Sequence, residues 1–343
     1  MSYTVKSSEK LRTSGADMET KALLYLMNFH SDGENIYYYV VDFFNDLTGM
    51  DSCSQQMWDL QSKAEKSPSP KAVGESLVTL FKNYSSDFEF KTYILFLGGV
   101  NKTLRIDSSK FCFDVSNVAC TALLSVKEGL RAAIAEKTYI ENKIVTDYEI
   151  DDFLKKVFFV IDDKTKEEYI KSIIKVNDRI IPHNSTLIAI FNEIKAAQSS
   201  KKDMGCVEGL TIETCDQALN YGRHLTKNEI KMLVLNRVIN CNPMGKGVPI
   251  HFIPIYSQFP PESQAHYLED CKLALAQALF NKNNGENFWR LFENIYTNII
   301  ASPALDVEYI YRLLDPSIIK SCSCDFDTLS LKYLISLIKD GIQ

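Results

Sequence analysis

Apolar residues follow two spacings in the first half of the chain, and they predict alternating strands and helices. The aromatic and β-branched run IYYYVVDFFNDL (36–47) predicts a strand, and MWDLQSK (57–63) predicts a second strand that forms a hairpin with it. FKTYILFLGG (90–99) is nearly continuously apolar, which is typical of a central strand covered on both faces. The run VFFVID (157–162) predicts a fourth strand. Helical spacing predicts helices over 15–28, 70–84, 116–138 and 164–176.

The second half of the chain carries helical spacing almost throughout. Helices are predicted over 186–199, 212–223, 227–239, 262–281, 286–301, 306–313 and 328–339. The chain is therefore expected to hold an α/β domain over residues 1–185 and an all-α domain over residues 186–343, which would serve partner docking or oligomerisation.

Composition is that of an ordinary globular protein, with 45% hydrophobic and 24% charged residues among 343. No run of eighteen apolar residues occurs, and the N-terminal segment lacks the apolar stretch of a secretory signal, so we expect a cytoplasmic protein without a membrane partner. The nine cysteines contain no CxxC pair and are interpreted as reduced thiols.

The net charge of −6 is unlike that of a free-standing nucleic-acid binder, which is usually basic. Any contact with nucleic acid would need a local basic surface or a partner that brings the polymer.

The predicted strand 57–63 directs three polar side chains to one face, because alternate residues of a strand share a face. These are Asp59, Gln61 and Lys63, and Asp46 ends the strand predicted before them. A carboxylate on one strand and an amide carbonyl on its neighbour supply the oxygen ligands that Mg²⁺ prefers. A lysine two residues beyond that carbonyl would orient an attacking water or stabilise charge on a phosphate.

At these residues the sequence resembles the PD-(D/E)xK superfamily, which has the restriction-endonuclease-like fold. Glutamine in place of the glutamate of the motif is a variant found in its Mrr-like and related branches. Three segments are similar to the DNA endonuclease domain of CD-NTase-associated anti-phage effectors, and to the nucleases of nuclease–helicase defence systems of the Hachiman and Abp type. They are GADMETKALLYL (15–26), FFNDLTGMDSCSQQMWDLQSK (43–63) and SPKAVGESLVTLFKNY (69–84).

The resemblance implies a restriction-endonuclease-like core, a mixed sheet flanked by helices, with a magnesium or manganese site. It implies Asp46 and Gln61 as metal ligands, Lys63 as the catalytic lysine, and Glu19 as a further acidic ligand. Asp51 is a rival for the role of Asp46. Asp59 could support the ligands from the same strand face.

The alternative interpretation of the same residues is structural. Asp46 and Asp51 would be turn residues, and Lys63 would be a solvated strand end.

The function that the resemblance implies is a metal-dependent DNA endonuclease of bacterial anti-phage defence, controlled by a helicase or ATPase partner and with a possible homo-oligomeric state. One alternative is a catalytically inactive nuclease fold that binds DNA or acts as a scaffold subunit of a defence complex. Another is a ribonuclease. The segment LFLGGVNKT (95–103) lacks the spacing of a phosphate-binding loop and is interpreted as a strand-end turn.

Overall fold

The computed structural model describes residues 2–6, 15–136, 145–176, 182–245, 247–282 and 285–342. The chain forms two compact units, and the first contains Met1–Tyr169 together with Asn192–Lys227. The second contains Ile170–Phe191 and Asn228–Gln343. The expectation of a mixed sheet flanked by helices and a helical C-terminal region is confirmed at this level. The units do not follow a boundary at residue 185, since 192–227 belong with the sheet.

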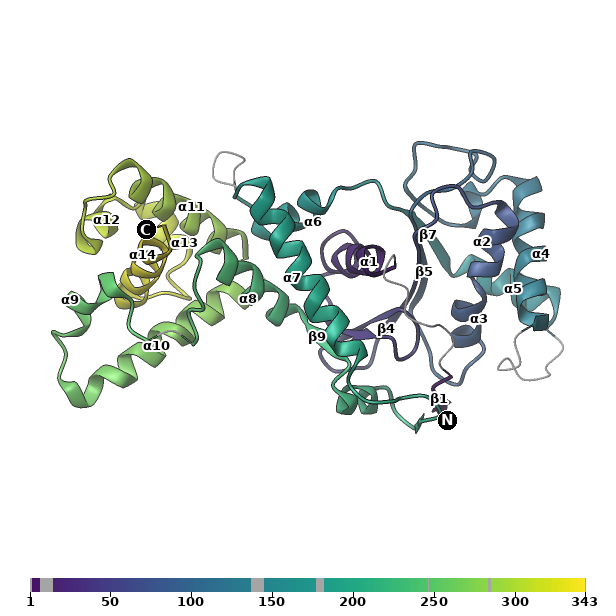
Figure 1. Ribbon diagram of the computed structural model, residues 1–343, viewed down its shortest axis with the longest axis horizontal. Helices are drawn as coiled ribbons and strands as arrows, with labels where there is room; N and C mark the ends of the chain where they lie inside the picture. The colour runs from purple at the N-terminus through teal and green to yellow at the C-terminus, as the bar shows by residue number, and fades with distance from the viewer. Residues whose placement is uncertain are drawn as a thin grey trace. The chain divides into compact units, whose positions relative to one another are not determined.

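A seven-stranded mixed sheet is the centre of the first unit (Figure 1). Its central strands β4, β5 and β7 are parallel, and the outer pairs are antiparallel. The apolar run at 90–99 therefore forms an inner strand, as predicted. In spatial order the strands are β6 (Cys112–Phe113), β7 (Val157–Ile161), β5 (Thr92–Leu97), β4 (Met57–Lys63), β3 (Leu47–Asp51), β2 (Ile36–Val41) and β9 (His224–Thr226).

The single strand predicted over 36–47 is wrong, because the chain reverses direction within it. Val41 pairs with Leu47 in the antiparallel β2–β3 ladder. Asp42 adopts a φ of 53°, which turns the backbone out of the extended conformation. Phe43 and Phe44 lie in this turn and are nevertheless buried, so the turn carries the apolar composition of a strand. The hairpin that contains β4 is therefore β3–β4.

Helices cover both faces of the sheet (Figure 1). α1 (Ala16–Asn28) lies on one face, as predicted over 15–28. The helix predicted over 70–84 is divided at Leu77. Four helices lie on the other face: α2 (Pro70–Ser76), α3 (Val78–Tyr84), α4 (Cys120–Glu136) and α5 (Asp147–Lys155).

Two glycines allow α2 and α4 to approach closely. A Cβ atom at Gly74 would lie 2.0 Å from the carbonyl oxygen of Val126, and one at Gly129 would lie 2.0 Å from that of Lys71. Neither position can hold a side chain without moving a backbone.

Residues 192–227 complete the first unit. The C-terminal half of α7 (Asn184–Lys202) packs along α1, where Lys195 Nζ lies 2.8 Å from Asp17 Oδ1. The helix predicted over 212–223 is wrong. That segment holds the end of β8 (Thr211–Ile212), which pairs with β1 (Tyr3–Thr4), and the 3-10 helix η2 (Cys215–Tyr221).

The second unit is helical, as the spacing of its apolar residues predicts. No helix among the described residues has both the length and the apolar character needed to cross a bilayer. The remaining elements among the described residues are η1 (Val115–Asn117), α6 (Lys166–Ile174), α8 (Lys227–Val238), η3 (Ile250–Phe252), α9 (Ile253–Tyr256), α10 (Pro261–Phe280), α11 (Gly285–Ala301), α12 (Val307–Leu313), α13 (Pro316–Ser321) and α14 (Thr328–Ile342).

Candidate metal and catalytic site

Asp46 lies in the turn between β2 and β3, immediately before β3, and not at the end of a strand. Leu47 pairs with Leu60, so Asp46 takes the register position opposite Gln61. Its Oδ2 accepts hydrogen bonds from Gln61 Nε2 at 2.8 Å and from both the backbone N–H and the hydroxyl of Ser62 at 2.9 Å. The turn therefore brings this carboxylate to the C-terminal end of β4.

The electrostatic environment of Asp46 disfavours a charge. Burial raises the pKa of its carboxyl to about 6, against the positive charge of Lys63 and the hydrogen bonds from Ser62, which lower it. The negative charge of Glu19 adds to the rise. Lys63 and Glu19 are thus close enough for their charges to act on Asp46.

Gln61 is buried on β4, and α3 holds its amide from the other side. The hydroxyl of Thr79 donates to Gln61 Oε1 at 2.7 Å, while Gln61 Nε2 donates to Asp46. A hydroxyl both donates and accepts, so rotation of the amide by half a turn keeps the bond to Thr79. That rotation directs Oε1 toward Asp46 and creates a pair of oxygens.

Glu19 reaches the site from α1 and is paired with a cation. Its carboxylate forms an ion pair with Lys202, at the C-terminal end of α7, and both side chains are largely buried. Glu19 would have to exchange this partner in order to bind a metal.

Asp51 and Asp59 do not join this cluster. Asp51 lies at the opposite end of β3, where its Oδ1 accepts from the backbone N–H groups of Gln55 and Gln56 at 2.6 and 2.9 Å. Asp51 is thus the last residue of β3, and its side chain caps the turn that follows. Asp59 is fully buried against α3, and its Oδ2 accepts from Asn83 Nδ2 at 2.7 Å.

The Asp59 carboxyl is buried, and its neighbours stabilise the ionised form too little to offset the cost of burial. Burial raises its pKa to about 7, although the bond from Asn83 and the charge of Lys82 lower it. The Asn45 side chain also lowers the pKa, but no well-aligned hydrogen bond reaches Asp59 Oδ1 from the described part of the chain. Asp59 therefore belongs to a polar network beneath the site, where the negative charge of Asp46 also acts on it.

The donor set fits a hard cation only after small rearrangements. The described ranges contain no group of three or more His, Cys, Asp or Glu side chains that could hold a metal. Asp46, the rotated amide of Gln61 and a released Glu19 would supply three oxygens, which suits Mg²⁺ together with water ligands. These are the residues that would hold the ion.

Sequence reasoning missed three residues that build the site: Ser62, Thr79 and Lys202. Ser62 lies within the Gln-x-Lys segment, but strand alternation assigned it to the opposite face. Ser62 nonetheless contacts Asp46, because Asp46 lies in a turn at the end of the β3–β4 ladder. Thr79 and Lys202 come from helices whose packing partners the sequence does not reveal.

The glycine pair after β5 confirms the interpretation of 95–103 as a strand-end turn. Gly98 N donates to the carbonyl oxygen of Lys63 at 2.8 Å. A Cβ atom at Gly99 would lie 2.1 Å from the carbonyl oxygen of Lys66. The glycines thus allow this turn to support the end of β4 that carries Lys63.

Comparisons with known proteins add nothing to this geometry: no family model, no curated protein and no solved structure matches the chain.

Proposed function

We propose that this protein is a metal-dependent DNA endonuclease. The observation that carries the proposal is the meeting of Asp46 and Gln61, at 2.8 Å, within the electrostatic reach of Lys63 and Glu19. These four residues were selected from the sequence for this chemistry, and they come from α1, the β2–β3 turn and β4. The geometry thus supports the motif that the sequence resembles.

Each side chain has a chemical part in hydrolysis of a phosphodiester. Asp46 and Gln61 would hold the cation, and Glu19 would complete its ligands after release from Lys202. A bound Mg²⁺ would neutralise phosphate charge and lower the pKa of a water molecule. Lys63 would orient that water and stabilise the negative charge of the transition state.

The setting we propose is bacterial anti-phage defence in the cytoplasm. It is supported by the resemblance of residues 15–84 to defence nucleases. The net charge of −6 is unlike that of a free-standing nucleic-acid binder, so a partner would bring the DNA to this protein. A helicase or ATPase that loads DNA would be such a partner. The helical second unit would carry the docking surface and any homo-oligomeric contact.

Substitution of Lys63 tests the proposal. Lys63→Ala should keep the fold and lose a hundredfold or more of its magnesium-dependent cleavage of plasmid DNA, because loss of one charge-stabilising group raises the barrier by several kcal/mol. Lys66→Ala, three residues along and exposed, is the matched control and should cleave at the parental rate. Parental cleavage by Lys63→Ala would refute the assignment. RNA offered beside DNA distinguishes a ribonuclease.

A second candidate is a catalytically inactive DNA-binding or scaffold subunit of a defence complex. Two observations favour it. The Gln61 amide directs its N–H group, and not its oxygen, at Asp46, and Glu19 is held in an ion pair with Lys202, so neither side chain is arranged to bind a metal. Titration with Mn²⁺ discriminates between the two. An enzyme should bind the ion in a manner that Asp46→Ala abolishes, whereas a scaffold should show no such binding.

A further inference from the structure

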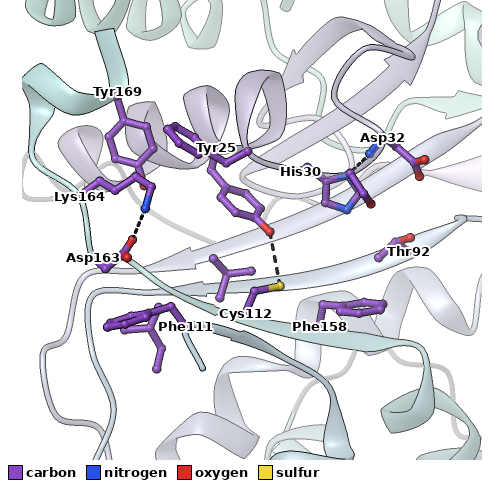
Figure 2. A pocket seen from close by; sticks show the side chains of 14 residues that line it. Tyr25, His30, Asp32, Thr92, Phe111, Cys112, Phe158, Asp163, Lys164 and Tyr169 are labelled. Carbon is purple, nitrogen blue, oxygen red and sulfur yellow. Dashed lines mark hydrogen bonds and ion pairs between the residues drawn. The ribbon is translucent and has the colours of Figure 1, made fainter. Parts of the chain in front are cut away.

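A pocket lies on the α1 face of the sheet, away from the candidate metal site. It has a volume of about 420 Å³, within the range of small-molecule sites. Figure 2 shows Tyr25 above it, Phe111 and Phe158 below, and His30 and Thr92 at one end. Its lining shares no residue with the cluster of Glu19, Asp46, Gln61 and Lys63.

Three aromatic side chains around this pocket are unusually exposed for their size. Phe29, Phe111 and Phe158 have exposed fractions of 37%, 45% and 40%. Phe158 lies within β7, whose other four residues are buried. An aromatic ring left open to water in a hollow offers a large stacking surface to a flat ligand.

The charged groups of the lining are already neutralised, which argues against an ionic ligand. Asp32 Oδ2 accepts from Trp58 Nε1 at 2.9 Å and pairs with Lys91 Nζ at 2.8 Å. Asp163 pairs with Lys164 at 2.7 Å. A charged ligand would give up its hydration without gaining an unpaired counter-ion.

The pocket also contains polar groups that can form hydrogen bonds with the edge of a heterocycle. Thr92 is only 8% exposed, and its hydroxyl makes no hydrogen bond to any residue that the structure describes. His30 Nδ1 accepts from the backbone N–H of Asp32 at 3.1 Å, so the ring proton lies on Nε2. Burial lowers the pKa of His30, which keeps the ring neutral. Thr92 is thus a donor and acceptor, and His30 a donor.

We propose that this pocket binds a nucleobase, that is, an uncharged planar heterocycle with hydrogen-bonding groups on its edge. The phenylalanine rings supply stacking, and Thr92 and His30 supply polar contacts. The base can come from a free nucleoside or from a single-stranded nucleic acid. The site does not depend on the proposed nuclease chemistry, and Lys63→Ala should leave it unchanged.

Calorimetric titration of the full chain with adenosine, guanosine, cytidine and thymidine, and separately with short single-stranded oligodeoxynucleotides, tests the proposal. Phe158→Ala should weaken binding roughly tenfold, the value of one lost stacking contact. Thr92→Val, which keeps the shape and removes the hydroxyl, should weaken it roughly fivefold. Tyr148→Ala removes an exposed aromatic residue outside the pocket and should bind as the parent does.

A second measurement uses the protein without substitutions, so its result does not depend on whether a variant folds. Cys112 is exposed at the pocket, and Cys120 is exposed outside it. Bound ligand should slow alkylation of Cys112 by iodoacetamide and leave Cys120 unaffected.

The source of the base follows from which ligands bind. Protection by nucleosides identifies a free ligand, and protection by oligonucleotides alone identifies a strand. The proposal is overturned if neither class binds, if binding leaves Cys112 unprotected, or if N-acetyltryptophanamide binds in preference to every nucleoside.

Discussion

The hydroxyl of Thr79 on α3 donates a 2.7 Å hydrogen bond to Oε1 of Gln61 on β4. The other end of the amide donates to Asp46. Because a hydroxyl can donate to the amide oxygen or accept from the amide nitrogen, Thr79 anchors the amide in either orientation. Thr79 is thus a positioning residue for the proposed metal ligand.

Thr79→Val should reduce both Mn²⁺ affinity and DNA cleavage about tenfold, since the loss of a group that orients a ligand typically costs ten- to hundredfold. Thr79→Ser keeps the hydroxyl and should behave as the parent does. Titration of both variants with Mn²⁺ checks this. Equal loss in the two variants would point to packing and not to the hydrogen bond.

Asp46→Asn should separate stability from metal binding. Because burial raises the pKa of Asp46 to about 6, the ionised carboxylate destabilises the fold above that pH. The amide keeps an acceptor for Ser62, so at about pH 8 the free energy of unfolding should rise, by on the order of 1 kcal/mol. Mn²⁺ binding should be lost. Urea denaturation and Mn²⁺ titration measure the two effects, and a variant that is less stable yet still binds the ion would contradict the assignment.

Lys202→Met tests Glu19 as a ligand. The substitution removes the counter-ion of Glu19 and leaves an aliphatic side chain of similar length. If Glu19 binds the cation, Mn²⁺ affinity should rise severalfold, because no ion pair has to be broken first. Lys201→Met is the control next to it in the sequence. Unchanged or weaker affinity in Lys202→Met would remove Glu19 from the ligand set.

The pH dependence of stability should report on Asp59. Burial raises its pKa to about 7, so the folded protein holds this proton more tightly than the unfolded chain, whose aspartates titrate near pH ~4. The stabilisation is complete below about pH 4 and is lost as the pH rises to about 7. The free energy of unfolding should fall over this window by on the order of 2–4 kcal/mol, at about 1.4 kcal/mol per pKa unit.

Denaturation with urea across this pH range measures the slope. Asp59→Asn should flatten it and leave the smaller contribution of Asp46. Asp203→Asn, at an exposed position, should keep the parental slope. A parental slope in Asp59→Asn would show that this carboxyl is ionised in the folded protein at all these pH values.

The sequence alone determined what depends on short-range spacing. Strand β4 and the shared face of Asp59, Gln61 and Lys63 follow from the two-residue period of an extended chain. The inner position of β5 follows from its nearly continuous apolar run, and α1 follows from its helical spacing. These features lie within single segments, so no knowledge of their partners was needed to predict them.

Tertiary structure decided which of the polar residues meet. The turn before β3 contains buried Phe43 and Phe44, and its apolar composition concealed the reversal that carries Asp46 to Gln61. The contact of Thr79 with Gln61 and that of Lys202 with Glu19 join segments far apart in the chain. The aromatic pocket likewise depends on how helix α1 covers the sheet. Such contacts are set by strand register and helix packing, and neither can be inferred from composition or periodicity.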